Sequence, residues 1–145
     1  MPDHFLNDHE IERIGTAFIE RSLPKREWTH AGHFAAVLYL LRHRSDWDVS
    51  AAMPPLIRAY NEATGVANTD SGGYHETITQ ASIRAARHVL TAHHPEIPLH
   101  RGVNALLDSE MGRSDWLLRY WSRVTLFSVA ARRHWVAPDV APLPF

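Results

Sequence analysis

Two short stretches of the sequence place histidines where helices are expected to begin. The stretch W-T-H-A-G-H carries His30 and His33, and the stretch G-G-Y-H-E-T-I-T carries His75. Residues spaced i, i+3 on a helix lie on one side, one turn apart, so His30 and His33 can both bind one ion. Three converging imidazoles with one coordination position left open are typical of catalytic zinc or non-haem iron sites. The two stretches therefore predict a metal centre built from His30, His33 and His75.

The elements that would bring these histidines together are helices. Apolar residues recur at helical spacing and no segment has the alternation of a strand, so the expected class is all-α. Short connections join the expected helices 29–44, 53–64 and 74–92, which makes successive helices antiparallel neighbours. Two reversals leave the first and third of them parallel. Their N-termini, with His30 and His75, are therefore expected at the same end of the molecule.

Asn7 or Asp8 is expected to cap a first helix that ends before Pro24, and Asp48 or Ser50 is expected to start the helix that follows 29–44. Because proline is tolerated only in the first turn of a helix, the pair at positions 54 and 55 predicts that the regular helix begins near Met53. The segment 115–127 is expected to be one helix, capped by Ser114, with Val124 on its buried face. Residues 1–145 are expected to form a single domain, a bundle of five or six helices with an extended Pro-rich C-terminal tail.

Further polar residues complete the predicted site. Glu76 points about 100° away from His75 on a helix, so it would act as general base or, in a distorted first turn, as fourth ligand. The chain has no cysteine, so the expected cofactor is a divalent ion held by nitrogen and oxygen: zinc, iron, copper or nickel. Zinc would favour hydrolysis by an activated water, and iron or copper would favour oxygen chemistry. The residues expected to shape the substrate pocket are Trp28, Tyr60, Asn68, Thr69, Asp70, Tyr74 and Thr79.

Other interpretations of the same residues stay open. Two helix N-termini carry partial positive charge, so their shared end could instead be a non-catalytic pocket for a small anion. His30 and His75 could also be helix-start residues hydrogen bonded to each other or to loop carbonyl groups. A third alternative is an interaction protein that uses a basic C-terminal face formed by Arg119, Arg123, Arg132 and Arg133.

The composition restricts the partners. A formal net charge of −1 gives no general attraction to nucleic acid or anionic lipid. The longest apolar run, residues 34–41, is too short to span a membrane, and the polar N-terminus does not have the pattern of a signal peptide. We therefore expect a soluble, cytoplasmic protein that binds a small substrate, either anionic or neutral, and neither nucleic acid nor membrane. The sequence leaves the oligomeric state open.

Longer motifs resemble a family of short bacterial proteins of unassigned function. The motifs are W-T-H-A-G-H, R-A-Y-N-E-A-T-G, N-T-D-S-G-G-Y-H-E-T-I-T, R-Y-W-S-R-V-T-L-F-S and W-V-A-P-D-V-A-P-L-P, and the resemblance spans residues 28–144. It implies that residues 28–33 and 68–79 belong to a recurring pattern, and it implies no reaction. The HxxH pair with a distant histidine is more loosely similar to the three-histidine site of DinB-like metal-dependent proteins. Its order and spacing differ from theirs, so that similarity is an analogy between folds only.

Overall fold

The computed structural model describes residues 4–145, and the first three residues of the expected domain lie outside the described part. The described chain is all-helical and has no strand, which confirms the class expected from the periodicity. Short 3-10 helices (η) punctuate the α-helices. In chain order the elements are α1 (Asp8–Ile19), η1 (Lys25–Glu27), α2 (His30–His43), α3 (Val49–Ala63), α4 (Glu76–Ala92), α5 (Leu99–Asp108), η2 (Glu110–Gly112), η3 (Trp116–Arg119), α6 (Arg123–Leu126) and α7 (Val129–Arg133).

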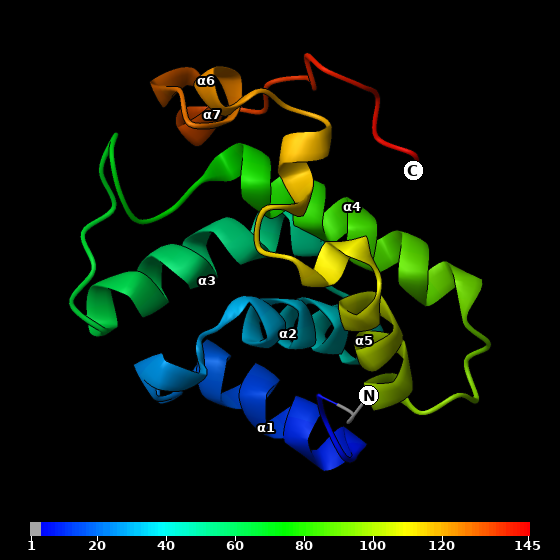
Figure 1. Ribbon diagram of the computed structural model, residues 1–145. Helices are drawn as coiled ribbons and strands as arrows, with labels where there is room; N and C mark the ends of the chain where they lie inside the picture. Colours follow the sequence, from blue (N-terminus) through cyan, green and yellow to red (C-terminus); the bar gives the residue numbers. More distant parts are fainter. Residues whose placement is uncertain (1–3) are drawn as a thin grey trace.

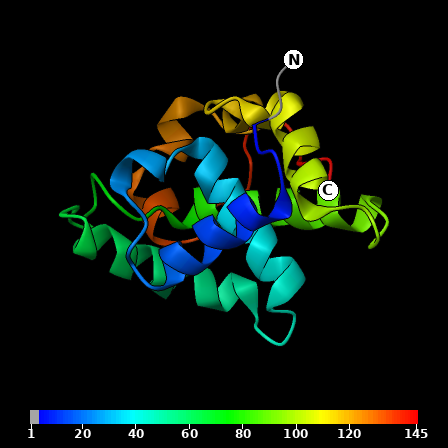
Figure 2. The same cartoon turned by 90° about the horizontal axis from the view of Figure 1, so that it is seen from below.

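The helices are stacked in layers. Figure 1 shows α1 at the bottom, α2 above it, then α3 and α4, with α6 and α7 at the top. The α1 and α2 helices can approach closely because Gly15 has no side chain. A Cβ at this position would lie only 2.2 Å from Cδ1 of Tyr39. Seen from below in Figure 2, the N-terminal segment runs beside α5. There the Asn104 side chain donates to the Phe5 carbonyl at 2.8 Å and accepts from the Phe5 amide at 3.0 Å.

The starts of the long helices follow local capping chemistry. Asn7, Thr29 and Asp48 have extended backbones, and the side-chain oxygen of each accepts a backbone N–H from the first turn of α1, α2 or α3. The chain reverses between α2 and α3 and again between α3 and α4, so α2 and α4 both begin on the left side of Figure 1. This arrangement places the segments that carry the histidines of interest at one side of the molecule.

The two prolines of α3 lie inside the helix, so the expectation that its regular part begins only near Met53 is wrong, whereas the expected start at Asp48 is confirmed. The helix already begins at Val49 and contains both Pro54 and Pro55. A proline has no N–H, so Pro54 leaves the Ser50 carbonyl oxygen without its usual helical donor. The Gln80 side chain of α4 supplies the missing donor, because its Nε2 lies 3.0 Å from that oxygen. A contact between helices thus compensates for the N–H that Pro54 lacks at a position beyond the first turn of α3.

The expected helix 115–127 is also wrong, because the segment is broken into η3 and α6. The Ser122 hydroxyl caps α6 and also donates to Asp139 Oδ2 at 2.7 Å, while the Ser122 amide donates to Asp139 Oδ1 at 2.8 Å. Thr125 adds a third donor to the same carboxylate at 2.7 Å. These hydrogen bonds hold the pKa of Asp139 at about 2. Val124, expected to be buried, is 86% exposed as a result of this break.

The residues after α7 cross the surface of the domain without forming a helix. Val136 accepts a hydrogen bond from the indole N–H of Trp121 at 2.9 Å, and Val140 donates to the Tyr120 carbonyl at 2.9 Å. At the end of the chain the Phe145 ring stacks on His88, with centroids 5.3 Å apart. Within residues 4–145 every helix is too short or too polar to cross a membrane.

Candidate ligand cavity

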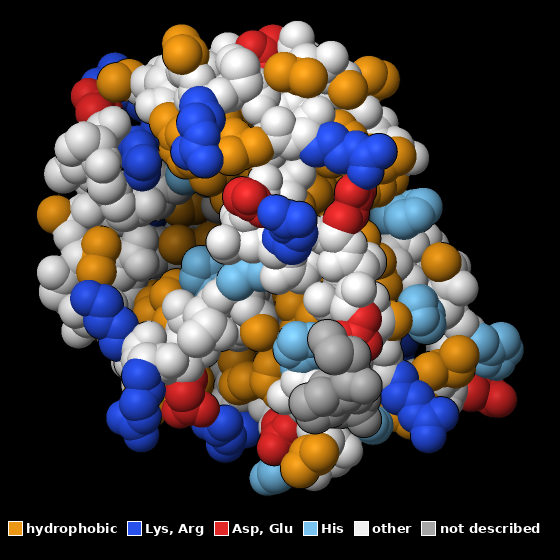
Figure 3. All heavy atoms as spheres, in the orientation of Figure 1, with side chains coloured by type: hydrophobic (Ala, Val, Ile, Leu, Met, Phe, Trp, Pro, Cys, Tyr) orange, Lys and Arg blue, Asp and Glu red, His pale blue; other side chains and the backbone are white. Residues whose placement is uncertain are grey.

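A cavity of about 580 Å³ lies between α2, α3, α4 and the segment 114–127. Figure 3 shows a hollow on this face, with apolar side chains in its depth, histidine surface at its lower edge and basic side chains above it. Sites for small molecules have this size and this mixture of an apolar wall with a few polar groups. The lining residues are Trp28, His30, His33, Phe34, Val37, Met53, Ile57, Asn61, Val66, Gly73, Tyr74, His75, Ile78, Thr79, Ser82, Ser114, Asp115, Trp116, Leu117, Leu118, Arg123, Leu126 and Phe127.

His33 presents its ring to the cavity. Trp28, which lies at the end of η1, stacks on the core residue Phe18 with ring centroids 4.5 Å apart and planes 9° apart. The His33 ring lies against this fixed indole, 3.9 Å between centroids. The side chain of His33 is exposed, and its ring makes no hydrogen bond to any residue of the described part. The surrounding protein and the neighbouring His30 lower the pKa of His33, so the imidazole is neutral at pH 7.

His30 begins α2 and has one ring nitrogen occupied. Its Nε2 lies 2.7 Å from the carbonyl oxygen of Met111 in η2, so this nitrogen carries the proton and donates. The ring also meets Phe34 edge-on, with centroids 5.2 Å apart. This tautomer leaves the Nδ1 lone pair of His30 available, and the ring orientation is fixed by both contacts.

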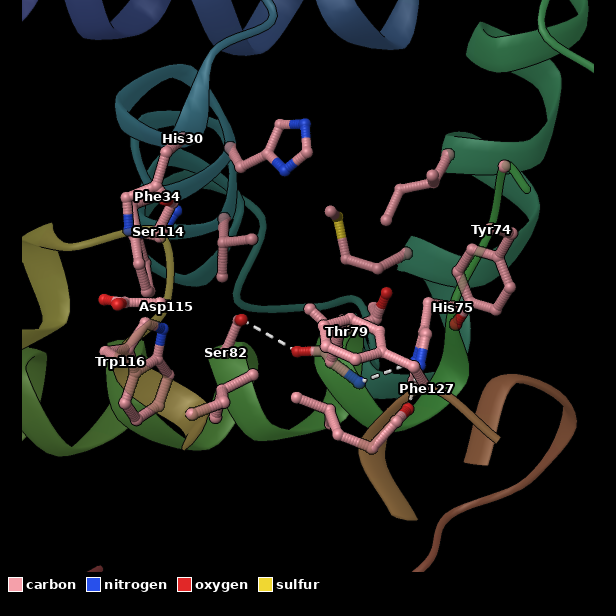
Figure 4. Close-up of a pocket in the computed structure, with 18 of the residues that line it drawn as sticks. His30, Phe34, Tyr74, His75, Thr79, Ser82, Ser114, Asp115, Trp116 and Phe127 are labelled. Atoms are coloured by element: carbon pink, nitrogen blue, oxygen red, sulfur yellow. Dashed lines mark hydrogen bonds between the residues drawn. The ribbon is translucent and has the colours of Figure 1, made fainter. Parts of the chain in front are cut away.

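His75 is the N-cap of α4, which begins at Glu76. The expected helix 74–92 would have placed His75 inside its first turn. Its Nδ1 accepts the Ile78 amide at 3.2 Å, and its Nε2 donates to the Leu126 carbonyl of α6 at 2.7 Å. Both nitrogens of this buried ring are therefore occupied. Burial is the main cause that lowers the pKa of His75, which keeps the ring in the neutral form that makes both bonds. In Figure 4 His30 and His75 lie on opposite sides of the cavity.

The loop that precedes α4 is held by Asn68, which does not line the cavity, although Val66 and Gly73 of the same loop do. The Asn68 Oδ1 accepts from Asn61 Nδ2 and from the Tyr74 amide, both at 3.0 Å. Gly73 has a φ of 77°, and a Cβ there would lie 2.5 Å from the Ala67 carbonyl oxygen, so only glycine fits. The structure thus gives Asn68 a role in loop shape, and it places Tyr74 in the cavity wall.

The other residues predicted for the site are divided between the wall and elsewhere. Thr79 and Trp28 line the cavity. Tyr60 lies underneath, fully buried, with its hydroxyl donating to the Leu23 carbonyl at 2.8 Å. Thr69 is exposed in the loop, and Asp70 forms a bidentate ion pair with Arg133 at 2.8 and 2.5 Å.

Glu76, the predicted catalytic residue, is not part of the cavity wall. Its Oε1 accepts the Tyr74 hydroxyl at 2.5 Å and Gln80 Nε2 at 3.4 Å. This contact and burial raise the pKa of the Tyr74 hydroxyl above its usual value, with burial the larger cause. The Glu76 carboxylate thus has protein partners, and it fixes Tyr74 in the wall.

The three histidines of the predicted metal centre differ in whether a ring nitrogen is left for an ion. All three histidines line one cavity, but His75 keeps no lone pair for a ligand. Among residues 4–145 no cluster of three or more His, Asp or Glu side chains is placed so that it could hold one ion. His30 and His33 are the pair that could do so, since each keeps a nitrogen without a partner in the described chain.

The residues predicted for the site do not include the part of the wall that comes from the C-terminal third. Ser114, Asp115, Trp116 and Phe127 all line the cavity, and Figure 4 shows them around its edge. Arg123 also lines it, although the sequence placed this residue on a basic surface. These residues are far from positions 28–33 and 68–79 in the chain, so no local motif connects them. The aromatic content of segment 116–127 was the signal that could have indicated a pocket wall.

No protein-family model, curated protein or solved structure matches the chain significantly. The family resemblance of the motifs therefore stays a prediction, and the cavity itself is the basis for a proposed function.

Proposed function

We propose that the protein binds a small, largely apolar molecule in this cavity, and that His33 recognises the polar part of that molecule. The observation that carries the proposal is the state of the His33 ring. It is neutral, lies in an otherwise largely apolar wall, and has no hydrogen-bond partner in the described chain. A neutral imidazole carries one donor and one acceptor, and both are available to a ligand.

The stacked rings beneath His33 support a recognition role. Trp28 rests on Phe18, and its ring also lies 5.0 Å from that of Tyr60, which is anchored to Leu23. A side chain that is fixed before the ligand arrives loses little conformational freedom on binding. If the ligand is a substrate, the neutral His33 could remove a proton from it, because the base form is present at pH 7.

The test uses a neutral fluorescent probe that is apolar and carries one N–H donor, N-phenyl-1-naphthylamine. We expect saturable binding to the protein with an increase in fluorescence. His33→Leu keeps an apolar wall but removes the acceptor, so it should weaken binding about fivefold, the effect of one hydrogen bond of about 1 kcal/mol.

The matched control is His9→Leu, since His9 is exposed on α1 and does not line the cavity. This variant should bind the probe like the wild type. Absence of saturable binding to the wild type would overturn the proposal. Equal binding by the His33→Leu variant would remove His33 from it.

A second candidate is the small metal-dependent enzyme expected from the sequence, with zinc, iron, copper or nickel on His30 and His33. The observation that favours it is the hydrogen bond from His30 to the Met111 carbonyl. Histidines that bind metals commonly donate the other ring N–H to a carbonyl group in this way. The ion would supply Lewis acidity at the cavity wall.

Elemental analysis of protein purified without an affinity tag tests this second candidate. We expect near-stoichiometric metal in the wild type and in His9→Ala, and its loss in His30→Ala and His33→Ala. A chelator should lower the Tm of the wild type, because a ligand bound only to the folded state stabilises it. Wild-type protein with only trace metal and a Tm indifferent to chelator would exclude the candidate.

A further inference from the structure

We infer that the natural ligand is an amphipathic anion, an apolar molecule that ends in a carboxylate, and that Arg123 binds its negative charge. The inference rests on the proposed function, because it concerns the same cavity. It differs from the anion pocket expected from the sequence, which relied on helix N-termini rather than on a side chain.

The two charged side chains of the wall differ in whether they have a partner. The ionisable residues of the lining are His30, His33, Tyr74, His75, Asp115 and Arg123. Of these, Asp115 and Arg123 carry a full charge at neutral pH in their ordinary states. The Asp115 carboxylate already has a counter-ion outside the cavity, because Arg113 Nε lies 3.2 Å from its Oδ1. Arg123 makes no ion pair or side-chain hydrogen bond within the described chain.

The backbone at Arg123 is fixed by contacts of the residues on both sides of it. Ser122 is bound to Asp139 through its amide and hydroxyl, at 2.8 and 2.7 Å. Three residues later the Leu126 carbonyl accepts the ring N–H of His75. The Asp139 carboxylate of this network accepts Ser122 and Thr125 rather than the guanidinium of Arg123. The backbone thus places Arg123 at the wall, and no carboxylate of the described chain pairs with its guanidinium.

The rest of the wall matches the apolar part of such a ligand. Aromatic side chains from three different segments border the space in Figure 4, namely Phe34, Trp116 and Phe127. Met53 and Ile78 add aliphatic surface from α3 and α4. A guanidinium binds a carboxylate through two parallel hydrogen bonds. One unpaired guanidinium balances a single negative charge, which favours a monocarboxylate over a doubly charged phosphate.

The experiment measures displacement of N-phenyl-1-naphthylamine by octanoate and by 1-octanol, a neutral molecule of the same chain length. A wall selected only for apolar surface should prefer octanol. We expect octanoate to displace the probe at least as well as octanol from the wild type. Arg123→Gln should weaken octanoate about fivefold, the factor for one exposed ion pair of about 1 kcal/mol, and should change octanol less than about twofold.

Arg101→Gln is the matched control, since Arg101 is an exposed arginine on α5 outside this cavity. It should leave both displacements unchanged. Thermal unfolding of each variant shows whether it is folded, and the exposed side chain of Arg123 predicts a Tm like that of the wild type. Octyl phosphate is added as a third competitor to distinguish a phosphate ligand.

The outcomes separate this inference from the proposed function. Probe binding with octanoate no better than octanol, or an Arg123→Gln variant that binds octanoate like the wild type, overturns the anionic ligand and keeps the cavity as a binding site. Displacement by octyl phosphate at much lower concentration than by octanoate overturns the carboxylate. Failure of the wild type to bind the probe overturns both proposals.

Discussion

Replacing His75 with alanine should destabilise the protein through two separate losses. The first is the N-cap of α4, because Nδ1 of His75 accepts the Ile78 amide at 3.2 Å. The second is the hydrogen bond from Nε2 to the Leu126 carbonyl at 2.7 Å, which ties α4 to α6. The residue is 7% exposed, so water cannot fully replace either partner.

The size of the effect follows from these two contacts. Loss of an N-cap costs about 1 kcal/mol. Loss of a hydrogen bond to a buried carbonyl costs about 1 to 1.5 kcal/mol. The free energy of unfolding should therefore fall by about 2 to 2.5 kcal/mol, which for a chain of this length lowers the Tm by about 6 to 10 °C. His75→Asn keeps a capping oxygen but cannot reach Leu126, so it should lose about half as much.

The loss should depend on pH with a definite sign. Burial lowers the pKa of His75 in the folded state, so below the ordinary value of about 6.5 the unfolded chain binds more protons at this residue. Its contribution to stability is complete above that pH and is lost as the pH falls through the folded-state pKa. The difference between wild type and His75→Ala should therefore be largest at pH 7 to 8 and should shrink toward pH 5.

Urea denaturation followed by circular dichroism measures these differences. A His75→Ala variant within about 0.5 kcal/mol of the wild type at pH 7.5 would refute the capping argument, because it is below the cost of an N-cap. A different result would favour metal ligation by His75. In that case a chelator would lower the Tm of the wild type to that of His75→Ala and would leave the Tm of the variant unchanged.

Three further perturbations test the contacts that shape the fold. Gln80→Met should reduce the free energy of unfolding by about 1 to 2 kcal/mol in urea titrations, because the Ser50 carbonyl loses its donor; an unchanged midpoint would show that water replaces the amide. Gly73→Ala should cost more than about 1 kcal/mol because of its φ of 77°. Gly72→Ala is the control, since its Cβ would meet nothing closer than 3.8 Å, and equal effects would contradict the strain. Asp139→Asn should lower the Tm at pH 7; with the pKa of Asp139 at about 2, that difference should persist above about pH 4 and decrease as the pH falls toward 2. A difference that did not change with pH would show that its charge is not involved.

The sequence alone determined the helical class and most helix starts. The apolar periodicity predicts the segments that became α1, α2, α3 and α4. Asn7, Thr29 and Asp48 cap helices because each side chain bonds to an amide only three residues away. Such contacts form within one turn, so they can be recognised from residue type and spacing. The short connections also predict correctly that α2 and α4 begin at the same side of the molecule.

The tertiary structure decided what the histidines do and where the second half of the cavity comes from. His75 bonds to a carbonyl 51 residues later, and Asp139 breaks the segment that periodicity would make one helix. The Ser50 carbonyl is satisfied by a side chain 30 residues away, which compensates for the N–H that Pro54 lacks. In each case a polar group needs a partner, but any of many distant groups could supply it. The chain reversals decide which distant group becomes the partner, so the partner cannot be predicted from the residues next to it in the sequence.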